Sequence, residues 1–208
     1  LLLMSWIESD GTVDAAAERD AAEHLAALHD ITAPRYGLAR DTLIGPLRQP
    51  NAWAEDWPGF FAEQRLLYMA RLAHEAGRLP GATRDRVETL AGRVDRWLDA
   101  PGPSSLLHGD MWGGNVLCRR TDDGNRIAAF IDPAVYYGDA EIELAFSTLF
   151  NTFGPAFFDA YSALRPLRPG FFEARRDLYN LYPLLVHVRL FGGSYLGAVE
   201  RILGRFGV

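Results

Sequence analysis

The chain has 208 residues, of which 49% are hydrophobic, and its formal net charge is −6. This length and composition allow one sizeable hydrophobic core, while the negative charge gives no electrostatic support for a nucleic-acid partner. No apolar run approaches the ~20 residues that span a membrane, so no membrane partner is expected. The single cysteine, Cys118, excludes an internal disulfide and predicts a reducing, cytoplasmic location.

The first half of the chain is predicted to be mainly helical, because its apolar residues recur at helical spacing between breakers such as Pro34 and Gly37. In chain order, we expect a buried strand over 1–7, a helix over 14–29, an irregular stretch over 38–56, a helix that begins after the N-cap Asp56, and a helix over 83–100. The irregular stretch is expected because Pro46 and Pro50 interrupt it.

The pattern then changes to short apolar segments that alternate with loops rich in Gly and Asp. Three segments are typical of strands: "SLLH" (105–108), "NVLC" (115–118) and "RIAAFID" (126–132). Asp123-Gly124 indicates a hairpin that pairs Val116–Arg119 with Arg126–Ile131. Helices are expected again over 139–151, 155–164, 171–190 and 194–206. The predicted fold class is therefore α+β, mostly helical, with a small β ribbon near the middle.

Polar side chains gather at the ends of these predicted strands. Asp110 follows the first strand, Asn115 begins the second and Asp132 ends the third. Because the second and third strands pair, we expect these side chains to converge at one end of the ribbon. Oxygen ligands of this kind suit Mg²⁺, and the Asp-x₄-Asn spacing is that of the protein-kinase catalytic loop. The pattern predicts Asp110 as a base, Asn115 and Asp132 as Mg²⁺ ligands, and His108 as a hydrogen-bonding support of the loop.

Several alternatives stay open from the residues alone. A single "HGD" is common and a lone Asp-Gly pair is usually a turn, although His108, Asp110, Asn115 and Asp132 together favour catalysis. Trp112 lies inside the loop, where its ring either stacks on a substrate or wedges the loop. The remaining histidines show no zinc-site spacing; His29 is expected to pack or to cap a helix end, and Cys118 to lie in the core.

The motifs "LLHGDMWGGNVL", "IDPAVYYGDAEIELAFSTLF" and "LYNLYPLLVHVRLFGGSYLG" resemble the fructosamine/ketosamine kinases of the aminoglycoside/choline kinase-like superfamily. The resemblance covers nearly the whole chain and implies the large, C-terminal lobe of a protein-kinase-like fold. It implies transfer of phosphate from ATP, with Mg²⁺, to a sugar hydroxyl of a ketosamine, small or protein-bound. In that scheme Asp110 matches the base, and Asn115 and Asp132 match the metal ligands.

The same resemblance assigns further residues. Trp112 and Tyr137 match positions near the sugar, and a hinge that pairs with adenine matches Met4, Ser5, Trp6 and Ile7. Glu143 departs from the family pattern, which has Asp there. The resemblance divides the chain into residues 1–8, the hinge, and 9–208, the kinase-like lobe.

The resemblance also implies an N-terminal lobe with a phosphate-binding Lys, but all 21 basic residues are Arg. We therefore expect that this lobe is missing and that the chain alone has little or no turnover. Self-association through the exposed hinge side is also expected, since a severed lobe uncovers apolar surface. Two other functions remain possible: an aminoglycoside-, choline- or homoserine-type kinase, and a degenerate, non-catalytic binding module.

Overall fold

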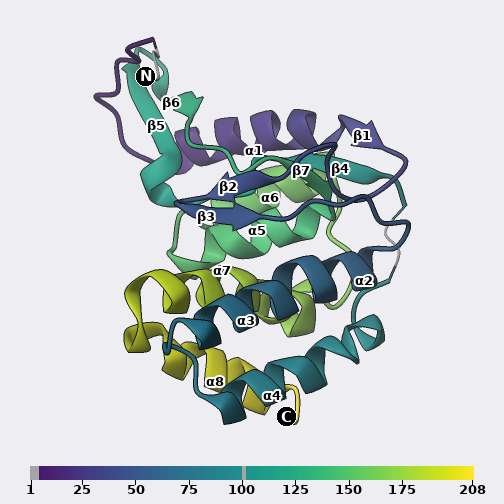
Figure 1. Ribbon diagram of the computed structural model, residues 1–208. Coiled ribbons are helices and arrows are strands. Elements are labelled where there is room, and N and C mark those ends of the chain that lie inside the picture. Colours follow the sequence, from purple (N-terminus) through teal and green to yellow (C-terminus); the bar gives the residue numbers. More distant parts are fainter. Residues whose placement is uncertain (1–4, 100–101) are drawn as a thin grey trace.

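The computed structural model of the chain describes residues 5–99 and 102–208. Figure 1 shows α1, α5, α6 and the short strands in the upper half of the molecule, above a lower half made of helices. The helices are α1 (Ala15–His29), α2 (Trp57–Phe61), α3 (Tyr68–Glu75), α4 (Gly81–Ala91), α5 (Ala140–Leu149), α6 (Pro155–Leu164), α7 (Arg176–Phe191) and α8 (Leu196–Arg205). The strands are β1 (Thr32–Ala33), β2 (Thr42–Ile44), β3 (Leu47–Gln49), β4 (Ser104–Leu107), β5 (Val116–Thr121), β6 (Gly124–Phe130) and β7 (Tyr136–Gly138). Two π-helical turns, η1 (Ala62–Leu67) and η4 (Phe171–Arg175), precede α3 and α7, and η2 (Val94–Arg96), η3 (Gly113–Asn115) and η5 (Gly193–Tyr195) are short 3₁₀ turns.

The predicted helices are confirmed, and two begin at the side chains that the sequence indicates. The Asp14 carboxylate accepts hydrogen bonds from the Ala16 and Ala17 amides, both at 3.0 Å, and Asp56 accepts one from Gly59 at 2.7 Å. Each cap satisfies amides that a helix leaves without an internal partner. The helix expected over 83–100 is shorter than predicted: α4 ends at Ala91, directly before Gly92, a residue that disfavours helix continuation.

The predicted β5–β6 hairpin is confirmed, although its turn lies one residue earlier than Asp123-Gly124 and the register shifts between Leu117 and Cys118. Val116 lies opposite Phe130 and Arg119 opposite Arg126. Asp122 and Asp123 form the connecting turn, and Gly124 follows it with a φ of 107°. The ribbon projects from the body at the upper left of Figure 1.

The stretch 38–56 is not irregular throughout, which corrects the sequence-based expectation. β2 and β3 form an antiparallel hairpin in which Ile44 pairs with Leu47. Pro46 lies in the turn, next to Gly45 with its φ of 54°, so the proline does not interrupt a strand.

A three-stranded sheet in the order β1-β4-β7 also forms. Only β4 of this sheet was predicted, because strands of two or three residues are too short to show a periodic pattern. The sheet holds β4 in place, and β4 leads directly into the "HGD" loop.

The strand expected over 1–7 is not found over Ser5–Ile7, and Leu1–Met4 lie outside the described residues. Trp6 is 93% exposed, so apolar character alone did not bury this segment. The chain joins the body further on, where the Gly11 amide donates to Cys118 O at 3.0 Å and Asp10 accepts from the Arg120 amide at 2.9 Å. None of the helices in the described residues combines the length and apolar character needed to cross a bilayer.

Candidate active site

The "HGD" loop turns sharply at Gly109, immediately after β4. Gly109 has a φ of 84°, a left-handed conformation that glycine adopts without steric cost. A Cβ at this position would lie 2.2 Å from Ala134 O and 3.3 Å from the ring of Tyr136. The absence of a side chain therefore lets this loop and the "DPA" loop touch, and it sets the direction of Asp110.

Asp110 is held by Asn115, the last residue of η3. The Asn115 amide nitrogen donates to Asp110 O at 2.7 Å and to Asp110 Oδ2 at 3.0 Å. Because both of these atoms are acceptors, the nitrogen must face Asp110, and Asn115 Oδ1 remains available as an oxygen ligand. Burial raises the pKa of Asp110 above its usual value, although the Asn115 hydrogen bond opposes the shift.

Asp132 is placed beside these groups by its neighbours in the chain. The Ile131 amide donates to Asn115 O at 3.0 Å, and the Ala134 amide donates to His108 O at 2.8 Å. Asp132 itself is exposed and has a φ of 52°, a left-handed conformation that Asp tolerates better than most residues. The three polar residues thus meet at one end of the β5–β6 ribbon, as the sequence predicts.

His108 connects the two loops. Its Nδ1 accepts the Asp110 amide at 3.3 Å, and its Nε2 lies 2.9 Å from Ile131 O. Since a carbonyl can only accept, Nε2 carries the proton and the ring is the neutral tautomer. These contacts give His108 the geometry expected of a residue that supports the loop.

Glu143, on α5, supports the same loop from below, and sequence reasoning missed this role. Its carboxylate accepts the Gly109 amide at 2.6 Å and the His108 amide at 3.2 Å. It also lies 2.9 Å from His29 Nε2, and His29 Nδ1 lies 2.7 Å from the Tyr161 hydroxyl. Burial opposes ionisation of Glu143, but the hydrogen bonds from His29 and Gly109 outweigh it and lower its pKa. His29 packs at the end of α1 as expected, with its ring against Tyr161. Its contact with a carboxylate 114 residues away was not predicted, because such a separation leaves no local signal.

A row of aromatic rings extends from the loop. Trp112 is 42% exposed, and a Cβ on Gly114 would lie 2.3 Å from its indole. The row continues through Phe150 at 6.3 Å, His187 at 4.9 Å from Phe150, and Tyr195 at 4.8 Å from His187, all between ring centroids. Trp112 therefore wedges the loop and also keeps an open face. His187 had no role in the sequence-based prediction; its Nδ1 lies 2.7 Å from Pro183 O, so that nitrogen is the donor, and in the neutral ring Nε2 is an acceptor.

Tyr137 lies on the other face of β7 from Tyr136. Its ring stacks on Trp53 at 6.2 Å, and its backbone pairs with Gly37 and Leu106. Tyr136 contacts Gly109 instead, because successive side chains of a strand point to opposite faces. The described contacts of Tyr137 do not include the "HGD" loop, and its assignment to the sugar site remains a prediction.

The residues present fit Mg²⁺, which needs only one or two protein ligands, better than a metal ion whose ligands all come from the protein. The described residues contain no group of three or more His, Cys, Asp and Glu side chains that could hold a metal. Asn115 Oδ1 and the Asp132 carboxylate supply two hard oxygen donors. Mg²⁺ commonly binds one or two such groups and completes its shell with phosphate and water.

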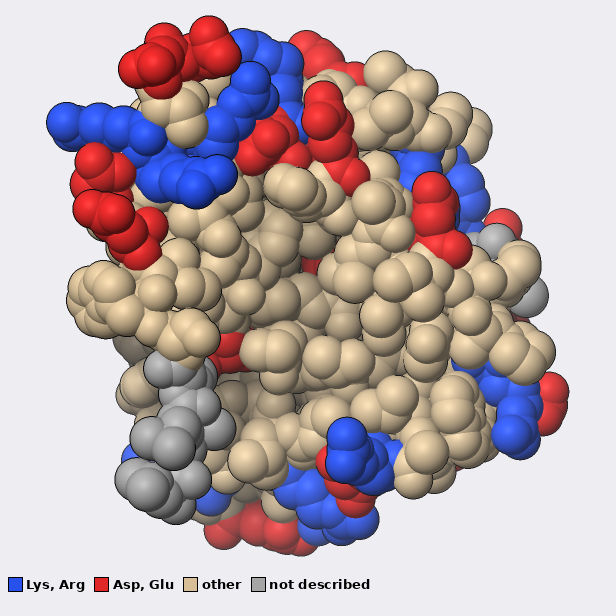
Figure 2. All heavy atoms as spheres, turned by 90° about the horizontal axis from the view of Figure 1, so that it is seen from above, with Lys and Arg blue, Asp and Glu red and all other residues tan. Residues whose placement is uncertain are grey.

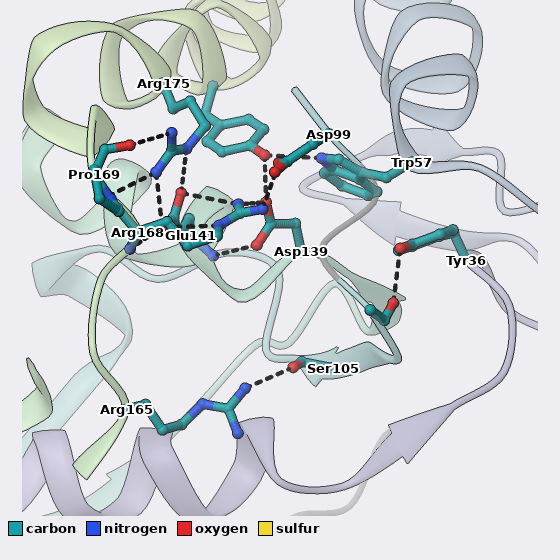
Figure 3. A network of polar contacts seen from close by, with 12 residues as sticks. Tyr36, Trp57, Asp99, Ser105, Asp139, Glu141, Arg165, Arg168, Pro169 and Arg175 are labelled. Carbon is teal, nitrogen blue, oxygen red and sulfur yellow. Dashed lines mark hydrogen bonds and ion pairs between the residues drawn. The ribbon is translucent and has the colours of Figure 1, made fainter. Parts of the chain in front are cut away.

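A separate acidic cluster lies at the start of α5 and is fully paired (Figure 3). Arg175 binds Glu141 with two nitrogens, at 2.5 and 3.1 Å, and Arg168 contacts both Asp139 and Glu141. Tyr179 donates to Asp139 at 2.5 Å. This network fixes the N-terminus of α5 and so the helix that carries Glu143.

Figure 2 shows the molecule from above, with charged side chains around the margin and a hollow among uncharged atoms near the centre. Acidic atoms are visible at the floor of the hollow, but on the described part of this face the acidic residues form no continuous surface. A polycation therefore finds no extended acidic patch here.

The fructosamine kinase family model matches residues 1–206. The chain is 40% identical over 206 residues to the "Probable ketoamine kinase" of Enterococcus faecium, with 99% of this chain and 71% of that protein covered. The crystal structure of a candidate fructosamine-3-kinase from Thermobifida fusca is 37% identical, with a TM-score of 0.82 over 97% of this chain and 69% of that one.

A thermostable mutant of the aminoglycoside phosphotransferase APH(4)-Ia shares the fold alone, at 18% identity and a TM-score of 0.58 over 96% of this chain and 71% of that one. The chain spans 71%, 66% and 61% of the lengths of three curated relatives, all named as ketoamine kinases. The match over nearly every residue, together with the kinase-like fold, shows that the chain belongs to the fructosamine kinase family.

Proposed function

We propose that the protein transfers the terminal phosphoryl group of ATP to a sugar hydroxyl of a ketosamine. The observation that carries this proposal is the contact between Asp110 and Asn115 beside Asp132, since a base and two oxygen ligands are the parts that phosphoryl transfer requires. The names of the relatives, ketoamine and fructosamine-3-kinases, support a ketosamine as the acceptor.

In this mechanism Asp110 accepts the proton of the attacking hydroxyl. Burial raises its pKa, which strengthens it as a base. Asn115 Oδ1 and Asp132 would hold Mg²⁺, which neutralises charge on the phosphates when bound. Glu143 and His108 keep the loop in place, so the base needs no rearrangement before proton transfer.

The acceptor side of the site is proposed to be the row of rings that begins at Trp112. The open face of Trp112 offers an apolar surface for a sugar ring, and His187 Nε2 can accept a hydrogen bond from a hydroxyl or ammonium group. Tyr137 remains a predicted contact of the sugar, and Ser5–Ile7 remain predicted contacts of the nucleotide. Neither assignment has a described contact that tests it.

Turnover by this chain alone is expected to be low. Protein kinases hold the ATP phosphates with a Lys, and this chain contains only Arg among its 21 basic residues. Arg is not a simple replacement for Lys at such a site, because its planar fork needs different geometry. Binding of the acceptor does not depend on that Lys.

The test is an ATP- and Mg²⁺-dependent phosphorylation assay on fructosyl-lysine, read by mass spectrometry of the product. It compares this chain, the form that includes any residues encoded upstream of Leu1 in the same frame, and Asp110→Asn in each. Product that Asp110→Asn abolishes supports the proposal. Folded protein that makes none in either form, or that phosphorylates an aminoglycoside or choline instead, contradicts it.

A further inference from the structure

Arg65 is a buried cation with no counter-ion in contact. Its side chain is completely buried in the π-helical turn η1, between α2 and α3. Its hydrogen bonds go to neutral atoms, Pro50 O and Asn51 Oδ1 at 2.7 Å each, with no ion pair to Arg65 among the described residues. Burying an unpaired charge is costly, so the packing around Arg65 must supply compensating interactions.

Aromatic rings supply part of that compensation. The guanidinium carbon lies 4.0 Å from the ring centroid of Tyr136, 4.6 Å from Phe60 and 5.4 Å from Tyr182. Such cation–π contacts are strongest when water is excluded. Two of these rings lead to the candidate active site, by separate routes.

The first route runs to the "HGD" loop. Tyr136 packs between Arg65 and Gly109, and the Cβ position of Gly109 is 3.3 Å from its ring. Gly109 directly precedes Asp110. Movement of the Tyr136 ring would therefore move the turn that aims the proposed base.

The second route runs to the "DPA" loop. Tyr182 donates to Gln49 Oε1 at 2.6 Å, and Gln49 Nε2 donates to Ala134 O at 2.9 Å. Arg65 bonds the same arm of this hairpin through Asn51, two residues after Gln49. Ala134 lies two residues after Asp132, so this route ends at the proposed metal ligand.

We propose that Arg65 is a positioning residue that fixes the "HGD" loop and the "DPA" loop relative to each other. Its planar fork bonds Pro50 and Asn51, directly after the hairpin, while the faces of the guanidinium remain free for rings, a combination that Lys does not offer. The consequence for catalysis rests on the phosphotransferase activity proposed above. The geometric claim does not, so its test requires no substrate.

The test measures hydrogen exchange in Arg65→Lys, in peptides that cover residues 105–116 and 128–136. We expect exchange in both to rise about tenfold, because local opening becomes easier when these loops lose their shared support. A purely structural role would lower global stability without selecting these loops. The matched control is Leu203→Ala or Val199→Ala, both buried in α8, whichever has the melting temperature closer to that of Arg65→Lys.

Gln49→Met is the second variant, for use if Arg65→Lys does not fold. It adds no unpaired charge to the interior. It cuts only the route to Ala134, so exchange should rise in 128–136 and stay unchanged in 105–116. The proposal is overturned if hydrogen exchange in these peptides is equal in Arg65→Lys and its matched control. It is also overturned if exchange rises in both loops of Gln49→Met. If the loops loosen but no variant or parent phosphorylates fructosyl-lysine, the positioning role stands and the proposed function fails.

Discussion

Two groups of carboxylates lie within one short part of the chain, and they differ in whether arginine side chains pair with them. Asp139 and Glu141 are surrounded by Arg168, Arg175 and a tyrosine hydroxyl (Figure 3). Asp110 and Asp132 form no ion pair with Arg among the described residues, and the only side-chain donor to Asp110 there is the amide of Asn115. A buried carboxylate that meets an arginine is structural, whereas one left unpaired keeps its charge available for a cation or a proton.

The pKa directions follow this difference with one exception. Burial opposes ionisation of Glu141, yet its hydrogen bonds from Arg175 and Arg168 lower its pKa, while burial raises the pKa of Asp110. Asp139 is the exception: complete burial raises its pKa despite the attraction of Arg168. Pairing with arginine therefore separates the two groups more reliably than the sign of the pKa shift.

The largest expected effect is loss of activity in Asp110→Asn. Removing the proposed base should lower kcat about 10³-fold, within the range that a general base contributes. Asn preserves the shape and can still accept from Asn115, so folding should be unaffected. Unfolding in urea provides the control, and a kcat within a few-fold of the parent rules out Asp110 as the base.

The next largest effect is on stability, in Glu141→Gln. This change leaves Arg175 without its carboxylate, and removal of one partner from a buried pair should lower the free energy of unfolding by about 3 kcal/mol. Activity per folded molecule should persist, since the side chain lies outside the proposed site. A variant as stable as the parent would show that the network contributes little.

The same variant has a defined pH dependence. The folded-state pKa of Glu141 lies below its usual value of 4.5, so its contribution is fully present above that pH and is lost as the pH falls below it. The difference between parent and Glu141→Gln should be constant near neutral pH and should shrink on acidification below pH 4.5. Urea unfolding at a series of pH values measures it; a difference that grows in acid has the wrong sign for this account.

A smaller effect is expected on metal binding in Asp132→Asn. Asn tolerates the left-handed backbone of Asp132, so stability should change by less than about 0.5 kcal/mol. Loss of one anionic ligand should weaken binding of Mn²⁺, a paramagnetic probe for the Mg²⁺ site, about tenfold in the presence of ATP. Glu141→Asp is the control carboxylate change outside the site, and equal Mn²⁺ affinity in Asp132→Asn and the parent contradicts the assignment.

The smallest effect is expected for Trp112→Phe. A smaller ring keeps an apolar face, so the KM for fructosyl-lysine should rise a few-fold while kcat is nearly unchanged, as expected when uniform binding is weakened. His187→Gln, which retains an acceptor, serves as the matched change further along the row. A fall in kcat at constant KM would instead show that Trp112 acts mainly by shaping the loop.

The sequence by itself determined much of the local structure. Helical periodicity, with Asp56 as the expected cap of the second helix, located the first helices, and Asp123-Gly124 located the ribbon. The positions of Asn115 and Asp132 were sufficient to predict that they meet, because they flank the locally paired β5–β6 ribbon, and Asp110 lies five residues before Asn115. These features depend on neighbours within a few residues, where pattern and chemistry act together.

Only the tertiary structure decided what supports that site. The hairpin of β2 and β3, the burial of His29 against Glu143, and the placement of Arg65 between two loops all depend on residues that are distant in sequence. The complete burial of Arg65 reverses the expectation from composition, since Arg is usually exposed. Such residues carry no local signal, because their partners are supplied by chain folding rather than by neighbouring sequence.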